Sequence, residues 1–177
     1  VEELKPKINN EFLWKSWTTL RAKNIYEDTL AMNILDVNSM TFQAIWEYNK
    51  GKEINSEDIH SAIDKKQQCL NQIDLIFRNF DFLALPSAQV YPFDKNLQFP
   101  KNINGIELDT YHRWLEVFIL SSLLDLPTVT IPVGFNKNGM PMGMQIIGRN
   151  KDDLNVFSFA SKYEDIFNYS KIKPKLN

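Results

Sequence analysis

Residues 126–148 read LPTVTIPVGFNKNGMPMGMQIIG, and this stretch decides the fold because it predicts two apolar strands joined by a tight turn. Asn138 and Gly139 tolerate the positive φ angles that a hairpin turn requires. Pro132 and Pro141 interrupt the two strands, which predicts edge or irregular pairing. The stretch also leaves room for a second backbone or a ligand at three glycines: Gly134, Gly143 and Gly148.

The residues before the hairpin predict a strand, a long loop and a helix. The apolar run 82–85 ends at a proline and indicates a buried strand. Residues 87–104 carry prolines and aromatic residues without periodicity, so we expect an ordered surface loop, and such loops are often functional. Residues 106–108 predict a short strand. A helix should follow over 109–124, because its first two residues, an Asp and a Thr, suit an N-cap.

Helical spacing of apolar residues marks four further segments, three before this region and one after it. We expect helices over 11–35, 40–48 and 56–79, with a break at 36–39, and a last helix over 152–167. The tail after this helix is basic and should fray.

Several residues indicate where these helices end and which sides they bury. Gly51 suits the C-terminal cap of the second helix, and Ser56 suits the N-cap of the third, with Glu57 and Asp58 in its first turn. The apolar stripe expected on the third helix is Ile59, Ala62, Ile63, Leu70, Ile73, Phe77 and Phe80. The apolar side expected on the last helix is Leu154, Val156, Phe157, Ala160, Tyr163 and Ile166.

These elements predict an α/β chain organised as one unit over residues 1–177. Residues 1–80 should be mainly helical, and residues 81–150 should contain the strands, the loop, a helix and the hairpin. Residues 151–169 should form the final helix. A chain of 177 residues with 44% hydrophobic residues can build a real core.

The composition argues against several classes of protein. A net charge of −2 lacks the basic footprint of a nucleic-acid binder, and dispersed Lys and Arg argue against a membrane-surface patch. No apolar run approaches the ~20 residues that span a bilayer. The single Cys69 fits a reducing compartment, and the first residues do not read as a signal peptide. We therefore expect a cytoplasmic protein without nucleic-acid or membrane partners.

Signatures of a metal site or an activated nucleophile do not stand out. His60 and His112 are far apart and have no nearby cysteine, so no metal site is expected. The sequence has no G-x-S-x-G elbow and no glycine-rich phosphate loop. Ser121 and Ser122 are flanked by V-F-I-L and L-L-D, which is typical of a helix interior. A hydrolase built from Ser87 or Ser121 with His112 stays open as a hypothesis, because triads assemble in space.

Residues 111–114, Tyr-His-Arg-Trp, are the densest group of functional side chains. Successive residues of a helix point in different directions, so these four cannot form one site alone. In one interpretation Trp114 packs in the core and Arg113 forms a surface ion pair. In the other, one or two of the four side chains face a pocket beside the loop 87–104.

The hairpin motif resembles the C-terminal hallmark of the amidase signature family of serine hydrolases. The matching pattern is L-P-x-x-x-x-P-x-G-F at 126–135, followed by G-x-P-x-G-x-Q-x-x-G at 139–148. The run D-F-L-A-L-P-S at 81–87 is similar to the family's D-x-L-x-x-P-T strand, and the helix to Glu164 resembles the helix that follows the hallmark. The resemblance covers roughly residues 14–164.

The resemblance implies the C-terminal part of the amidase signature fold, in which strands of a mixed β-sheet are covered by α-helices. Family members cleave amide C–N bonds with a nucleophilic serine, a bridging serine and a lysine base, since a serine hydroxyl needs a neighbouring base. These residues and their glycine-rich loop belong to the family's N-terminal half. This sequence holds no such loop. We therefore assign no catalytic residue, and the resemblance implies no cofactor.

Two positions depart from the family pattern, and neither carries chemistry. Ser122 and Asp125 stand where the family often has Asn and Gly before its proline.

The resemblance also implies that the C-terminal part of the family fold contributes one wall of the pocket for a small amide substrate. The candidate substrate-binding residues are Ser87, Gln89, Tyr91, Phe93, Tyr111, His112 and Trp114.

The two hairpin strands are apolar on both faces, as in strands buried within a layered sheet. The chain offers few further strands, so alone it should expose apolar surface and strand edges.

The leading hypothesis is a C-terminal fragment or subunit of an amidase, completed by a separate N-terminal part or chain. The alternative is a non-catalytic remnant or interaction module that self-associates. The sequence leaves open whether an enzyme completed in this way is a plain amidase or the ammonia-releasing subunit of an amidotransferase.

Overall fold

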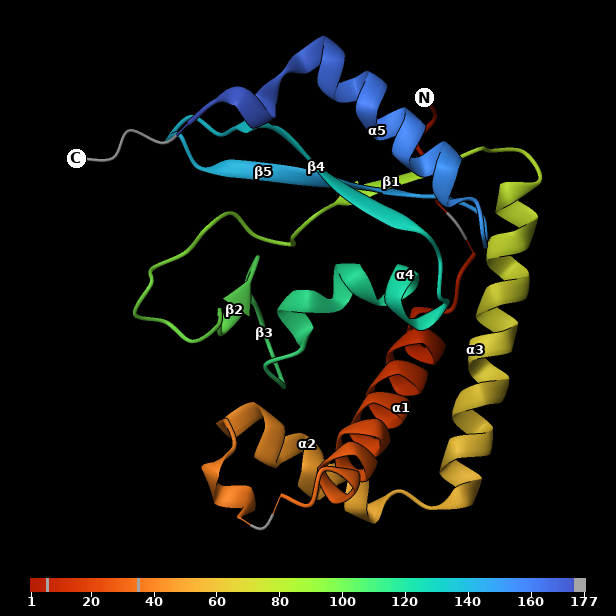
Figure 1. Ribbon diagram of the computed structural model, residues 1–177, viewed down its shortest axis with the longest axis vertical. Coiled ribbons are helices and arrows are strands. Elements are labelled where there is room, and N and C mark those ends of the chain that lie inside the picture. The colour runs from red at the N-terminus through yellow and green to blue at the C-terminus, as the bar shows by residue number, and fades with distance from the viewer. Residues whose placement is uncertain (6, 35, 174–177) are drawn as a thin grey trace. The chain divides into compact units, whose positions relative to one another are not determined.

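The computed structural model describes residues 1–5, 7–34 and 36–173 (Figure 1). They divide into two compact units, Val1–Ile73 and Asp74–Asn177. The expectation of a single unit stays a prediction. Within the described ranges, no helix is long and apolar enough to cross a membrane.

The first unit is helical, as predicted. Helix α1 (Asn10–Ala31) packs against helix α2 (Phe42–Glu53), and a short 3-10 helix, η1 (Val37–Ser39), lies between them in the sequence. Side chains satisfy the first backbone N–H groups of both α-helices: Asn9 accepts from the amide of Phe12, and Thr41 accepts from the amide of Ala44. The predicted end of the first helix at residue 35 lies outside the described residues.

Gly51 does not cap the second helix, so that prediction is wrong. Helix α2 continues to Glu53, and Gly51 is buried inside it. A Cβ atom at Gly51 would lie 2.1 Å from the carbonyl oxygen of Ala22 on helix α1. The glycine is needed because the two helix backbones approach each other closely, whereas the sequence pattern suggested a role in ending the helix.

Helix α3 (Ser56–Phe77) starts at the predicted residue, but its cap is Asn55 rather than Ser56. The Asn55 side chain accepts from the amide of Asp58 at 3.0 Å, and the Asp58 carboxylate accepts from the amide of Asn55 at 3.1 Å. This reciprocal pair satisfies two backbone donors at once. The buried side of the helix is Ala62, Cys69, Ile73 and Phe77, whereas Ile63 of the predicted stripe is 48% exposed.

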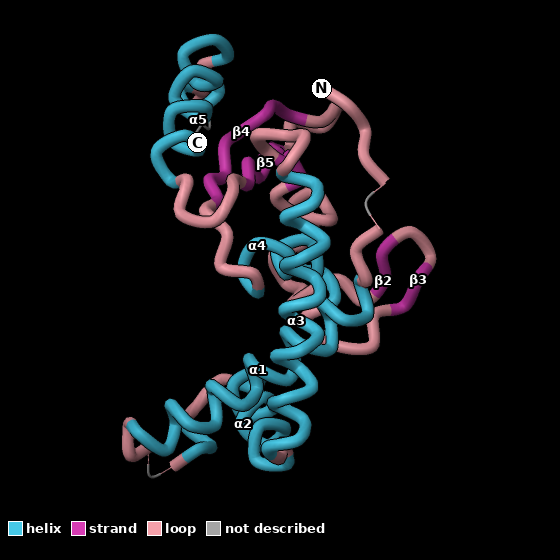
Figure 2. The backbone as a smooth tube through the Cα atoms, turned by 90° about the vertical axis from the view of Figure 1, so that its right-hand side faces the viewer, coloured by secondary structure: helices cyan, strands magenta, loops and turns pink. Residues whose placement is uncertain are grey.

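The second unit contains an antiparallel sheet with strand order β1-β5-β4. Its strands are β1 (Leu83–Pro86), β4 (Thr128–Phe135) and β5 (Pro141–Ile147). The predicted hairpin is confirmed as the pair β4–β5, in which Val129 lies opposite Ile146. Strands β2 (Asn102–Ile103) and β3 (Ile106–Glu107) form a small hairpin apart from this sheet (Figure 2).

The turn between β4 and β5 is longer than a two-residue turn. The amide of Asn136 donates to the carbonyl of Met140 at 2.9 Å, and Gly139 has a φ of +75°. This arrangement is a three-residue loop whose last residue is left-handed, a common alternative for hairpins. A register shift between Pro132 and Gly134 confirms the irregular pairing predicted from the proline.

Helices cover both faces of this sheet (Figure 1). Helix α5 (Asp153–Phe167) packs on one face, where Ile131 and Ile146 meet Ala160 in a buried cluster. The 3-10 helix η2 (Arg113–Phe118) and helix α4 (Ile119–Leu123) lie on the other face. The fold class is therefore confirmed as α/β, with helices over a sheet.

Three details of the second unit correct the sequence analysis. The strand predicted as buried, β1, is an edge strand with Ala84 and Pro86 exposed. The helix predicted over 109–124 is replaced by η2 and the short α4, and His112 before η2 makes no side-chain capping bond. On helix α5, Val156 and Ala160 are buried. The exposed residues of its predicted apolar side are Leu154, Phe157 and Ile166.

Candidate functional site

A pocket of about 470 Å³ opens within the second unit. Its wall combines the loop after β1 with Trp114 of η2 and with residues of both hairpin strands. The predicted candidates that line it are Ser87, Tyr91, Phe93 and Trp114. The other lining residues are Ala88, Val90, Pro92, Thr130, Ile131, Pro132, Pro141, Met142 and Gly143. The volume lies in the range of small-molecule sites in proteins, roughly 300–1,000 Å³.

Ser87 extends the pairing of β1 with β5 into the pocket wall. Its amide donates to the carbonyl of Gly143 at 2.9 Å, and its hydroxyl accepts from the amide of Gly143 at 3.1 Å. A Cβ atom at Gly143 would lie 2.6 Å from the Ser87 hydroxyl oxygen. Position 143 of the hairpin motif therefore has to be glycine, because a Cβ atom there would collide with the side chain of Ser87. This contact accounts for the close approach that the sequence predicted at Gly143.

Two aromatic rings form part of the pocket wall. Phe93, from the loop, meets Trp114, from η2, edge to face with ring centroids 5.5 Å apart and planes at 88°. This geometry is favourable for aromatic pairs. The contact fixes the loop to the 3-10 helix at the edge of the pocket.

Gln89 does not line this pocket and instead holds η2 in place. Its side-chain oxygen accepts from the amide of Val117 at 3.2 Å. The side-chain nitrogen of Gln145 donates to the carbonyl of the same residue, also at 3.2 Å. Two glutamine side chains therefore bind the backbone of the helix that carries Trp114.

Gln145 is the glutamine of the hairpin motif, to which the sequence analysis assigned no role in the site. It is 1% exposed in the centre of the sheet, and its side-chain nitrogen also donates to the carbonyl of Pro86 at 2.9 Å. Its side-chain oxygen accepts from the hydroxyl of Ser121 at 3.4 Å. One buried amide therefore joins β5 to the end of β1, to η2 and to α4. The signal in the sequence was a polar residue between apolar neighbours in a strand.

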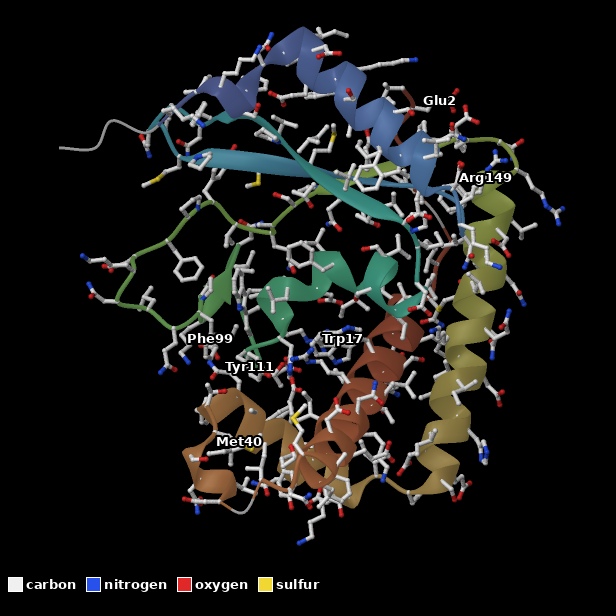
Figure 3. All side chains as sticks on the ribbon, in the orientation of Figure 1. Glu2, Trp17, Met40, Phe99, Tyr111 and Arg149 are labelled. Carbon is white, nitrogen blue, oxygen red and sulfur yellow. The ribbon has the colours of Figure 1, made fainter. Side chains whose placement is uncertain are left out.

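Tyr111 and His112 do not line the pocket. His112 is 2% exposed, and its ring lies 3.8 Å from that of Tyr111, measured between centroids. Tyr111 also packs near Phe99, at 6.3 Å between ring centroids, and both are labelled in Figure 3. Tyr111 and His112 therefore lie against each other in the turn before η2, and of the four residues 111–114 only Trp114 lines this pocket.

Arg113 forms the surface ion pairs that one interpretation predicted. Its guanidinium donates to the Asp109 carboxylate at 2.9 Å and lies 3.4 Å from Glu116. The hydrogen bond from Arg113 lowers the pKa of Asp109 below its ordinary value. These charged residues are not among those that line the pocket.

The pocket wall contains no group that could activate a nucleophile. Its side-chain hydroxyls belong to Ser87, Thr130 and Tyr91, and that of Ser87 is bonded to the backbone of β5. The hydroxyl of Ser121 donates to the carbonyl of Phe118 and to Gln145. Among the described residues, no group of three or more His, Cys, Asp or Glu side chains could hold a metal ion. The wall is suited to binding an apolar group.

Solved structures share this fold. A bacterial aryl acylamidase of the amidase signature family superposes with a TM-score of 0.79 at 19% identity, over 96% of this chain and 36% of that chain. A 6-aminohexanoate cyclic dimer hydrolase, solved with its substrate, superposes with a TM-score of 0.78 at 16% identity, over 99% of this chain and 39% of that one. At these identities the likeness establishes the fold.

The family follows from the sequence match. The Amidase family model matches residues 16–157, and the chain belongs to the amidase signature family. Curated relatives include a glutamyl-tRNA(Gln) amidotransferase subunit from Ehrlichia canis (strain Jake), 30% identical over 73% of this chain and 28% of that protein. The corresponding subunit from Orientia tsutsugamushi (strain Boryong) is 33% identical over 68% of this chain and 24% of that protein. The chain spans about a quarter of the length of these relatives and represents a partial, C-terminal-like segment of the family fold.

Proposed function

We propose that this chain is the C-terminal part of an amidase signature hydrolase that cleaves the C–N bond of a carboxamide. The observation that carries the proposal is the pocket at the hairpin motif. Ser87, on the strand motif, and Gly143, in the hairpin motif, bind each other in its wall. The two sequence motifs that identify the family therefore meet at one place that can accept a small molecule.

The chemistry has to come from residues outside this sequence. A serine attacks an amide carbonyl only when a base takes its proton, and the resulting oxyanion needs hydrogen-bond donors. The sequence has no Gly-Ser dipeptide, so it lacks the glycine-rich serine loop of the family. In the proposed enzyme, an N-terminal part carries the two serines and the lysine, and the present chain carries one wall of the substrate pocket.

Ser87, Tyr91, Phe93 and Trp114 are the proposed substrate-binding residues, because each lines the pocket. Gln89 is proposed to act indirectly, since it binds the backbone of η2 at Val117. Tyr111 and His112 lie outside the pocket wall, so the proposal does not include them as substrate contacts.

Two forms of the enzyme fit this proposal. The chain could belong to a plain amidase, or to the subunit of an amidotransferase that releases ammonia. The names of the curated relatives favour the second form, since they are amidotransferase subunits. In that form the chain would work in an assembly of several subunits.

The direct test is native mass spectrometry of the protein isolated from its own source, with denatured masses alongside. A second chain, or a longer polypeptide, that carries a Gly-Ser-Ser loop and releases ammonia from carboxamides supports the proposal. A 20.7 kDa chain alone, or a homo-oligomer of it, without amide hydrolysis would overturn it.

The second candidate is a non-catalytic module that self-associates. It is favoured by one observation: within the described residues, the edge strands β1 and β4 each pair with β5 alone. Unpaired strand edges are templates for pairing with another chain. The same mass measurement separates the two candidates, because a homo-oligomer without a serine-loop polypeptide supports the module.

A further inference from the structure

The two edges of the sheet differ in the backbone groups that they leave for another chain. Successive residues of a strand turn their N–H and C=O groups to opposite sides, so only alternate residues can bind a given neighbour. On β5, the carbonyl of Gly143 accepts from the amide of Ser87, and the amide of Gly148 donates to the carbonyl of Pro127. These two bonds fix the alternation: odd-numbered residues of β5 face β1, and even-numbered residues face β4.

The outer edge of β1 is nearly closed. Leu83 and Leu85 lie opposite odd-numbered residues of β5 and face them, so Ala84 and Pro86 turn their backbone groups outward. Pro86 has no N–H, and its carbonyl already accepts from the side chain of Gln145 at 2.9 Å. Short strands and prolines protect sheet edges against further pairing. Ala84 is therefore the one residue of β1 that offers both an outward donor and an outward acceptor.

The outer edge of β4 is open. This strand has eight residues, against four in β1, and none of them is charged. Val129 lies opposite Ile146 and faces it, so Thr128 and Thr130 turn their N–H and C=O groups away from the sheet. Both threonines are exposed, and among the described residues no strand pairs with this side of β4. Charged residues are a common protection of sheet edges, and β4 lacks it.

The groups on this edge are complementary to those of a second copy of the chain. When two β4 strands run antiparallel with Thr130 opposite Thr130, the N–H of each meets the C=O of the other. The same register sets Thr128 opposite Pro132, so that the Thr128 N–H meets the Pro132 carbonyl. Every outward N–H of the two threonines thereby finds an acceptor. The N–H that proline lacks removes none of these bonds.

We propose that the outer edge of β4 binds the same edge of a second copy, in a two-fold antiparallel pairing centred on Thr130. Such a contact is self-complementary, as two-fold interfaces must be. It also reaches the candidate site, because Thr130 and Pro132 line the pocket. Directly opposed side chains lie on the same face of a sheet, so Thr130 of the second copy extends the pocket wall. This inference concerns the chain by itself and does not depend on the proposed amidase function.

The test is analytical ultracentrifugation of the full chain over a range of concentrations, which should show twice the mass of one chain. Thr130→Pro removes the central outward N–H and leaves the pairing with β5, since proline is tolerated where the N–H of an edge strand faces outward. It should weaken the association about tenfold or more, because both copies lose a central donor. Ala84→Pro is the matched control on β1 and should leave the mass unchanged. Circular dichroism checks that both variants fold.

A cross-link tests the register without the use of proline. Opposed residues of a hydrogen-bonded antiparallel pair have Cα atoms about 5.5 Å apart, a distance that a disulfide spans. Thr130→Cys should therefore join two copies on oxidation, and Ala84→Cys should not. The native Cys69 is buried and does not compete.

Three results would overturn the inference. They are a wild-type chain that is monomeric at all concentrations, an association that Ala84→Pro weakens and Thr130→Pro does not, and a failure of Thr130→Cys to cross-link two associated copies. The proposed function is judged separately, by the serine-loop polypeptide and by ammonia release. A cross-link from Thr130→Cys to a serine-loop polypeptide in place of a second copy would overturn the choice of partner and support the proposed function.

Discussion

At the scale of single residues, Gln145 has the greatest influence on the candidate site. Its buried amide binds the carbonyls of Pro86 and Val117, which belong to the two segments that carry Ser87 and Trp114. We expect Gln145→Leu to lower the free energy of unfolding by about 2–4 kcal/mol, because two partly buried carbonyls lose their donor and a carbonyl left without one in the interior costs about 1–3 kcal/mol. Urea unfolding followed by circular dichroism measures the change.

The control for this prediction is Gln98→Leu, at an exposed position of the loop after β1. That substitution should change stability by less than about 0.5 kcal/mol, as surface changes usually do. If the two variants unfold at the same urea concentration, Gln145 does not hold the segments together.

Asp109 provides a prediction about pH. Its pKa is lowered in the folded chain by the hydrogen bond from Arg113, so the folded state favours the charged carboxylate. The pair therefore stabilises the chain above the ordinary Asp pKa of about 3.9, and this contribution is lost as the pH falls through the lower folded pKa. Because the Asp109 side chain is largely exposed, Asp109→Asn should cost no more than about 1 kcal/mol at pH 7.

The measurement for Asp109 is the thermal unfolding midpoint of the wild-type chain and of Asp109→Asn between pH 7 and pH 2.5. The two curves should converge at the acidic end, and Glu107→Gln, at a neighbouring exposed residue, should run parallel to wild type. If the difference between the unfolding midpoints of wild type and Asp109→Asn instead grew as the pH fell, the assigned ion pair would be wrong.

At the scale of helices and strands, the packing of α1 against α2 depends on one glycine. A Cβ atom at Gly51 would lie 2.1 Å from the backbone oxygen of Ala22, and a backbone atom cannot turn aside as a side chain can. Gly51→Ala should therefore destabilise the chain by about 1–3 kcal/mol, the usual cost of overpacking. Helix propensity alone predicts the opposite effect on stability, since replacing glycine by alanine inside a helix stabilises it by about 1 kcal/mol.

The two effects can be separated by thermal unfolding of Gly51→Ala beside Lys52→Ala, since Lys52 is the next residue of the same helix and is exposed. The first should lower the midpoint and the second should leave it nearly unchanged. A higher midpoint for Gly51→Ala would mean that the two helices do not approach as closely as described.

The elements themselves could largely be predicted from the sequence, whereas their ends and environments could not. Periodicity and turn residues located α1, α3, α5 and the hairpin, because these patterns depend on neighbours in the sequence. Gly51 was misassigned because a close contact with Ala22 on another helix leaves no local signature. Trp114 and Phe93 were candidates because they lie in the two segments that the family resemblance assigned to the pocket wall. Gln145 was known only as a position of the hairpin motif, and its role became apparent when strand pairing placed its amide beside Pro86 and Val117.

At the scale of the whole molecule, the described residues leave two kinds of surface uncovered. The edge strands β1 and β4 each have one side without a partner strand among those residues. Helix α5 exposes Leu154 and Phe157, at 78% and 63%. The two surfaces differ in how they can bind another chain. A strand edge offers unpaired backbone donors and acceptors, whereas the backbone groups of a helix are already hydrogen-bonded within it and only its side chains remain for contact.

We therefore expect the chain, purified without a companion, to self-associate through its strand edges and to bind an apolar dye. Lysines on edge strands oppose such pairing. The double substitution Ala84→Lys with Thr128→Lys, at exposed positions of β1 and β4, should shift the mass measured by analytical ultracentrifugation toward one chain. The matched control, Leu154→Lys with Phe157→Lys on α5, should reduce dye binding and leave the mass unchanged. A monomeric wild-type chain that unfolds cooperatively and binds no dye would contradict both expectations, and it would remove the physical reason for a companion that completes the sheet.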